Sequence, residues 1–147
     1  MTKTEVDLKI VLDRLSIVRQ AVVDLRTLPS ESFQVFAADR RNIFAADALL
    51  RRSIEALFDT AKHLLARAHG LGKLQYRETG KLAGERGLVA DSKMVTQFVR
   101  MGGFRNRLVH HYDDLTPEEL FGIVTRHLAD LEGIADELHR AAIRLAD

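Results

Sequence analysis

The stretch Phe104–Tyr112 holds the densest group of side chains that can handle protons and phosphates. It reads Phe-Arg-Asn-Arg-Leu-Val-His-His-Tyr. His110 can exchange a proton near neutral pH, Arg105 can hold phosphate oxygens with a planar charged fork, and Asn106 adds neutral donors and an acceptor. These groups are the minimum for metal-independent RNA cleavage, because RNA supplies its own 2′-hydroxyl and the protein need only move protons and stabilise charge.

The spacing of Arg105 and His110 sets a geometric condition on such a site. Residues five apart on an ideal helix are separated by about 140° in projection, whereas Asn106 and His110, four apart, are neighbours. A shared site therefore requires that Arg105 reaches around the helix, that the helix ends near His110, or that two chains bring their motifs together. A symmetric dimer would place two arginines and two histidines around one locally basic cleft.

Simpler interpretations of the same residues stay open at this point. An Arg-x4-His string is common by chance, and spacing alone favours a capped helix end with cations near its C-terminus over catalysis. His110 and His111 are adjacent, but no carboxylate–histidine spacing supports a metal site, so we expect neither metal nor other cofactor. Spacing selects His110 as the reactive histidine and leaves a contribution of His111 open. Tyr76 and Tyr112 are by default ordinary packing residues.

Composition places the chain among ordinary globular proteins. Its 147 residues are 46% hydrophobic and 29% charged, and 22 Lys and Arg against 21 Asp and Glu give a net charge of +1. Any nucleic-acid contact must therefore come from a local patch. Cysteine is absent, which excludes disulfides and thiolate chemistry. With no signal peptide and no apolar window of about 18 residues, we expect one domain over residues 1–147, in the cytoplasm and without membrane contact.

Hydrophobic periodicity predicts an all-α fold, an antiparallel up-down bundle of four main helices with short helices between them. The main helices are expected over residues 5–26, 39–68, 92–112 and 116 to nearly the chain end, and shorter turns over 31–36 and 76–83. Ser30 is expected to cap the first short turn. Thr116-Pro117-Glu118-Glu119 is a strong start signal, with Thr116 as cap and Glu119 three residues later.

Glycines mark the expected helix ends and weak points. Gly70 is expected to end the second main helix. Gly80 and Gly84 weaken the short helix that follows, by up to about 1 kcal/mol each. The pair at residues 102–103 could kink the motif helix or let another backbone approach closely.

The motif resembles that of a known family. Arg105–Tyr112 looks like the Arg-x4-His-x-Tyr motif of HEPN-domain ribonuclease toxins of the HepT type. Leu49–Asp59 is similar to that family's second helix, and Phe98–Tyr112 followed by Leu115–Leu120 is similar to its motif helix and the start of its last helix. The likeness covers most of the chain from about residue 39 onward.

This resemblance implies a specific function. Such proteins are homodimers in a type VII-like toxin–antitoxin system, and their paired motifs cut RNA without metal. By motif position, Arg105 and His110 would be catalytic and Asn106 a supporting polar residue. The implied partner is a minimal, MntA-like nucleotidyltransferase antitoxin, which transfers AMP from ATP onto Tyr112. Two alternatives remain: a non-catalytic helical binding partner of a nucleotidyltransferase, and a structural dimerisation bundle in which the motif only caps a helix.

Overall fold

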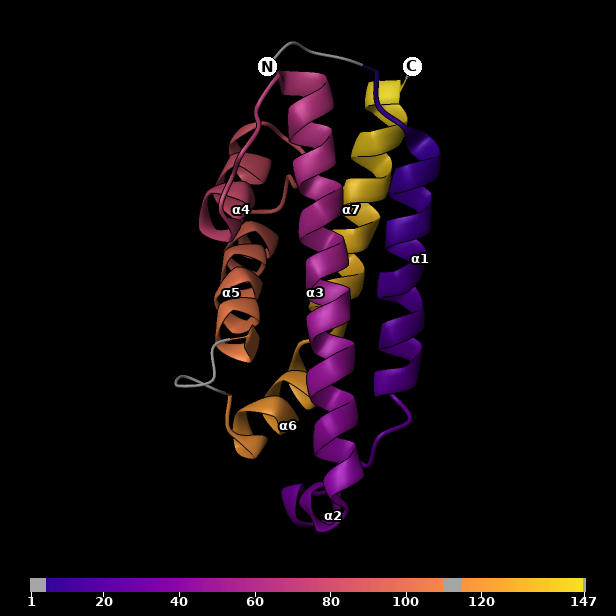
Figure 1. The fold of residues 1–147 in the computed structure, drawn as a ribbon, viewed down its shortest axis with the longest axis vertical. Helices are drawn as coiled ribbons and strands as arrows, with labels where there is room; N and C mark the ends of the chain where they lie inside the picture. The colour runs from indigo at the N-terminus through magenta and orange to yellow at the C-terminus, as the bar shows by residue number, and fades with distance from the viewer. Residues whose placement is uncertain (1–4, 110–114, 147) are drawn as a thin grey trace.

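Seven helices and no β-strand make up the computed structural model, which describes residues 5–109 and 115–146. The elements are α1 (Leu8–Leu25), α2 (Phe33–Ala38), α3 (Arg40–His69), α4 (Tyr76–Glu85), α5 (Ser92–Val109), α6 (Pro117–Arg126) and α7 (Leu128–Ala146). The four long helices, α1, α3, α5 and α7, run alternately down and up (Figure 1). The predicted all-α up-down bundle is confirmed. Of the helices described, none combines the length and apolar character required to cross a bilayer.

The apolar stripe that the periodicity predicts in α1 packs against α3 and α7. Asp7 caps the helix by accepting a hydrogen bond from the Ile10 backbone N–H at 3.3 Å. The buried side chains recur every three or four residues and therefore form one face; they are Val11, Leu15, Val18, Val22 and Leu25. Burying such side chains contributes about 1.5–3 kcal/mol each, so this face holds α1 to the bundle.

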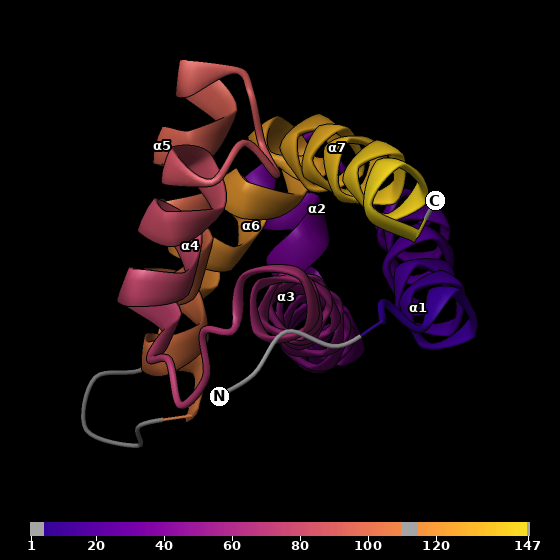
Figure 2. The same ribbon diagram turned by 90° about the horizontal axis from the view of Figure 1, so that it is seen from above.

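Helix α3 is the centre of the bundle, and its C-terminal end follows the predicted glycine signal. Asp39 caps its start by accepting from the Arg41 backbone N–H at 3.0 Å. Gly70 ends it with φ 69°, in the left-handed region that glycine adopts without strain. Helix α3 contacts each of the other six helices, and Figure 2 shows it between the α4–α5 side and the α1–α7 side.

Two glycines bring α4 close to α5. The sequence suggested that Gly80 and Gly84 would weaken this helix, yet α4 runs through both. A Cβ on Gly80 would lie 3.1 Å from Val99 Cγ2, and one on Gly84 would lie 2.8 Å from Val95 Cγ1. The glycines lie one helical turn apart, and side chains there would push the helices apart. The glycines lower the helix propensity of α4, but their lack of side chains permits a tight α4–α5 contact.

The prediction of one continuous last helix is wrong, because the helix is interrupted at His127. Helix α6 ends there, with His127 at φ −119° and its backbone N–H donating to the Ile123 carbonyl at 2.9 Å. The His127 ring Nδ1 lies 2.8 Å from Asp130 Oδ2 in the first turn of α7. His127 is the residue between the two helices, and its contact with Asp130 joins the end of α6 to the first turn of α7.

The predicted cap of the first short helix is also displaced. Ser32 caps α2, not Ser30, and its Oγ accepts a hydrogen bond from the Val35 backbone N–H at 3.2 Å. Both serines follow Pro29, but only Ser32 directly precedes the first helical residue, where its Oγ can reach the unpartnered amide of the third helical residue, Val35.

Candidate active site

The structure describes part of the predicted site. Arg105 and Asn106 lie near the C-terminal end of α5, where Asn106 is exposed and Arg105 is half-buried. His110, Tyr112 and the adjacent His111 lie outside the described residues. The site described below is therefore built from Arg105 and the residues around it.

Arg105 is held by residues of two other helices. Its Nε donates a hydrogen bond to Glu55 Oε1 on α3 at 3.3 Å, and its Cζ lies 4.4 Å from the centre of the Tyr76 ring on α4. The side chain is 27% exposed. Within residues 5–109 and 115–146, neither terminal nitrogen of this guanidinium makes a hydrogen bond. An arginine fixed by its Nε edge and its face can present those terminal donors to a phosphate.

Tyr76 joins this site to the core and to a second cation. Its ring centre lies 4.7 Å from that of Phe58 and 4.2 Å from Lys62 Nζ. A Cβ on Gly102 would lie 3.1 Å from Phe58 Cζ and 3.3 Å from Tyr76 Cβ, so glycine here lets both rings pack against α5 three residues before Arg105. Helix α5 continues unbroken through Gly102, so the predicted kink is absent, and the atoms that approach this glycine belong to side chains and not to another backbone. Burial raises the pKa of Tyr76.

Sequence reasoning missed Glu55 and Tyr76 as site residues. Tyr76 was assigned to ordinary packing, and Glu55 lay within a helix compared only as a whole. Both meet Arg105 through helix packing, and Glu55 is 50 residues away in sequence. No local spacing signals such a contact.

Arg107 and Glu119 connect the two sides of the segment that contains His110 and Tyr112. Arg107 Nη1 and Nη2 donate to the Glu119 carboxylate at 2.5 and 2.9 Å. The carboxylate also accepts from the Thr116 backbone N–H at 3.1 Å, which completes the predicted capping box. Hydrogen bonding from Arg107 lowers the pKa of Glu119 to about 2. The end of α5 and the start of α6 are therefore tied by a charged clamp.

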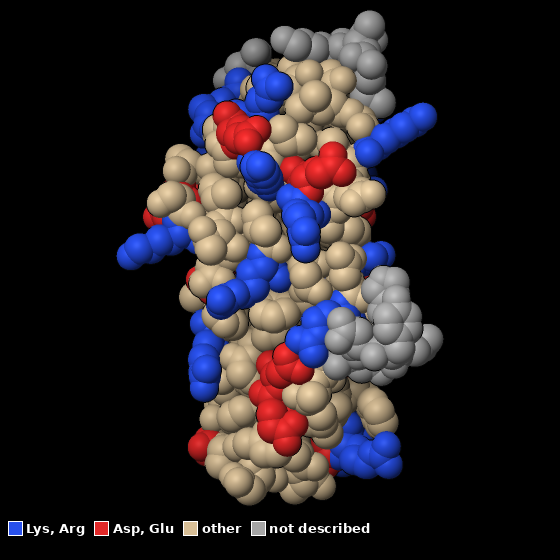
Figure 3. Space-filling model, turned by 90° about the vertical axis from the view of Figure 1, so that its left-hand side faces the viewer, with Lys and Arg blue, Asp and Glu red and all other residues tan. Residues whose placement is uncertain are grey.

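The α4–α5 side of the molecule is its basic side. Residues 73–109 contain eight Lys and Arg against three acidic residues, in a chain whose total charge is +1. Figure 3 shows this side, with Lys and Arg spread along its length and acidic side chains gathered in a few groups. This side therefore carries a local excess of Lys and Arg.

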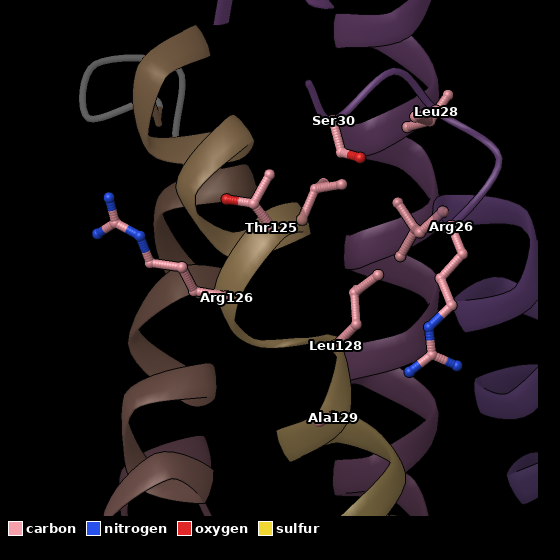
Figure 4. A pocket seen from close by; sticks show the side chains of 9 residues that line it. Arg26, Leu28, Ser30, Thr125, Arg126, Leu128 and Ala129 are labelled. Carbon is pink, nitrogen blue, oxygen red and sulfur yellow. The ribbon is translucent and has the colours of Figure 1, made fainter. Parts of the chain in front are cut away.

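A separate hollow near α2 offers less chemistry. It has a volume of about 380 Å³ and is lined by leucines and by the hydroxyls of Ser30 and Thr125. Figure 4 shows Arg126 directed away from it, and Arg26 forms an ion pair with Glu132. No pair of titratable side chains converges there. Among the residues that the structure describes, no group of three His, Asp or Glu side chains could hold a metal ion.

Comparison with known proteins places the chain in one family. The family model described as "Ribonuclease HepT-like" matches residues 18–138. No curated protein sequence matches the chain.

Solved structures share the fold over most of the chain. A tri-AMPylated HEPN toxin of Shewanella oneidensis, in complex with an MNT antitoxin, superposes with a TM-score of 0.78 at 22% identity and covers 88% of this chain and 96% of its own. A mutant of the toxin–antitoxin pair MntA–HpeT gives 0.76 at 25% identity, with 88% and 97% covered. A toxin–antitoxin structure with AMP-PNP gives 0.76 at 21% identity, with the same coverage.

Proposed function

Because this chain belongs to the HepT-like ribonuclease family, we propose that it is the toxin of a toxin–antitoxin pair. Its activity would be metal-independent endoribonuclease cleavage, with Arg105 and His110 as the catalytic residues and Asn106 in support. The observation that carries the proposal is the anchored guanidinium of Arg105, held by Glu55 and Tyr76 at the first position of the Arg-x4-His motif.

Each side chain has a defined chemical role in this proposal. Arg105 binds the scissile phosphate and stabilises the charge that develops on its oxygens. His110 moves a proton from the 2′-hydroxyl or onto the leaving oxygen. Glu55 and Tyr76 position the arginine, so less freedom is lost when the phosphate binds.

The active form is proposed to be a homodimer of this single domain. Two copies of the motif around one cleft would overcome the five-residue offset of Arg105 and His110, which on an ideal helix corresponds to about 140° in projection.

The proposed regulation is AMPylation by a nucleotidyltransferase antitoxin of the MntA type. The Tyr112 oxygen would attack the α-phosphorus of ATP, pyrophosphate would leave, and the phenol proton would pass to a base. A bulky anionic nucleotide beside the cleft would block RNA sterically and repel its phosphates. Support comes from the similar structures, since one is a tri-AMPylated HEPN toxin with an MNT antitoxin.

The test measures cleavage of a fluorescent RNA by purified protein in the presence of a chelator. We expect Arg105→Ala and His110→Ala to lose cleavage, while the exposed Arg140→Ala on α7 retains it. Tyr76→Phe should keep kcat and Tyr76→Ala should lower it, because only the first keeps a ring beneath the guanidinium. Wild-type cleavage by both Arg105→Ala and His110→Ala would refute the site.

The regulatory part is tested by intact mass. After incubation with the antitoxin and ATP, the toxin should gain whole AMP units, and Tyr112→Phe should gain none. A chain that accepts AMP but cuts no RNA would instead be a non-catalytic partner of the nucleotidyltransferase.

A further inference from the structure

A second group of cations lies farther along α3 from the Arg105 site. A hollow of about 510 Å³ opens between α1, α3 and the connection that follows α3. Three cationic side chains line it, each from a different segment: Arg14 from α1, Lys62 from α3 and Lys73 from the connection. Asp59 is the acidic residue in its lining. The hollow thus gathers positive charge in a concave surface.

One stripe of α3 links this hollow to Arg105. Glu55, Asp59 and Lys62 follow one another at steps of four and three residues and so lie on one side of the helix. Glu55 binds Arg105, whereas Lys62 lines the hollow and lies 4.2 Å from the centre of the Tyr76 ring that Arg105 also covers. Lys62 and Arg105 therefore contact the same aromatic ring, so Lys62 connects the lining of the hollow to the side chain that holds the proposed catalytic arginine.

The other groups in the hollow leave its cations available. Arg14 Nε is 4.0 Å from Asp59 Oδ2, with side chains 42% and 51% exposed, a long and solvent-screened pair. His63 Nε2 accepts a hydrogen bond from the Asp7 backbone N–H at 3.0 Å, so His63 fastens the start of α1 and is not free to bind an anion.

Lys73 lies at the edge of the hollow. Lys73 is exposed and has φ 55°, a left-handed conformation uncommon outside glycine. The preceding Gly72 is exposed as well. Lys73 also lines the hollow, so this turn places a third cation at its edge.

We propose that this hollow binds a backbone phosphate of the RNA strand, near the phosphate held at Arg105. The inference rests on the proposed ribonuclease function and extends it to a second contact. Flexible ammonium groups act as point charges toward phosphate and read no base edge, so the contact would position the strand without selecting sequence. A free mononucleotide offers the same phosphate chemistry, and the experiment separates these two sources.

The probe is a fluorescent 2′-O-methyl RNA oligomer, which cannot be cleaved because its 2′-hydroxyl is blocked. We expect Lys62→Ala/Lys73→Ala to weaken its binding about tenfold or more and to reduce the slope of log K against log salt by about 0.7, as loss of one phosphate contact with a single strand predicts. The matched control, Arg140→Ala/Arg144→Ala, removes two exposed cations from α7 and should change neither. Lys62→Arg/Lys73→Arg should restore binding.

Three outcomes would overturn the proposal. Equal weakening by both alanine pairs would mean that only total charge matters, and unchanged binding by the Lys62→Ala/Lys73→Ala variant would mean that the strand takes another path. If the Lys62→Ala/Lys73→Ala variant loses binding of free AMP, measured in the same way, but binds the oligomer as the wild type does, the hollow is a site for a free nucleotide.

Failure of the underlying function gives a different result. If the wild-type protein cuts no RNA but its oligomer binding depends on Lys62 and Lys73, the nuclease fails and the phosphate site stands. If Arg105→Ala abolishes cleavage while Lys62→Ala/Lys73→Ala leaves KM and binding unchanged, the nuclease stands and the second contact fails.

Discussion

Replacing Glu119 by glutamine should weaken both the fold and the proposed site. Glutamine keeps the shape of the side chain but removes the charge that receives two hydrogen bonds from Arg107. The segment that contains His110 lies between these two residues, so loosening the clamp should also lower RNA cleavage.

The magnitude follows from the pKa and the exposure. A pKa lowered from 4.5 to about 2 corresponds to about 3 kcal/mol for a fully buried pair. The Arg107 and Glu119 side chains are 32% and 37% exposed, so solvent screening reduces the expected effect to about 1–2 kcal/mol. The cost should be at the upper end if glutamine also weakens the bond from the Thr116 backbone N–H.

Urea unfolding at several pH values measures this effect. The carboxyl pKa is depressed in the folded state, so its stabilisation is complete above pH 4.5 and disappears as pH falls toward 2. The difference between wild type and Glu119→Gln should follow that course. Glu118→Gln is the matched control, since Glu118 is exposed and lies in the same first turn. A loss as large in Glu118→Gln, or a difference that persists unchanged at pH 2, would refute the reasoning.

Two further predictions concern stability alone. Gly84→Ala should destabilise the protein by about 1–3 kcal/mol, because its Cβ would lie 2.8 Å from Val95 Cγ1; Gly122→Ala, with nothing within 4 Å of its Cβ, should be neutral or stabilising, and thermal unfolding compares them. Burial lowers the pKa of His63 below 6.5, so the unfolded chain takes up its proton first and stability should fall as pH drops below 6.5. Urea midpoints at pH 7.5 and 5.5 should differ less in His63→Gln than in wild type; an equal difference would contradict this origin.

Most of the fold could be predicted because its signals are local. The stripe of α1 needs only the three- and four-residue spacing of its apolar side chains. The end of α3 needs only Gly70, and the start of α6 needs only Thr116 and Glu119. Each signal lies within one helical turn of the feature it specifies, so no knowledge of the packing is required.

The remaining features depend on tertiary contacts that no local sequence pattern predicts. His127 ends a helix although it is neither glycine nor proline, and its only local sign is Asp130 three residues later. Arg105 could be selected as a candidate, but its anchoring by Glu55 and Tyr76 arises from three helices meeting. The motif residues gave the chemistry, whereas the orientation of the arginine came from tertiary packing.

The central place of α3 has a consequence for how the molecule opens. A helix that touches all six others cannot detach until its neighbours do. Its backbone amides should therefore take up deuterium only through global unfolding, whereas those of the six-residue α2, at one end of the bundle, should exchange through small local openings. The exchange rate of the slowest amides of α3 would then report the free energy of unfolding of the entire chain.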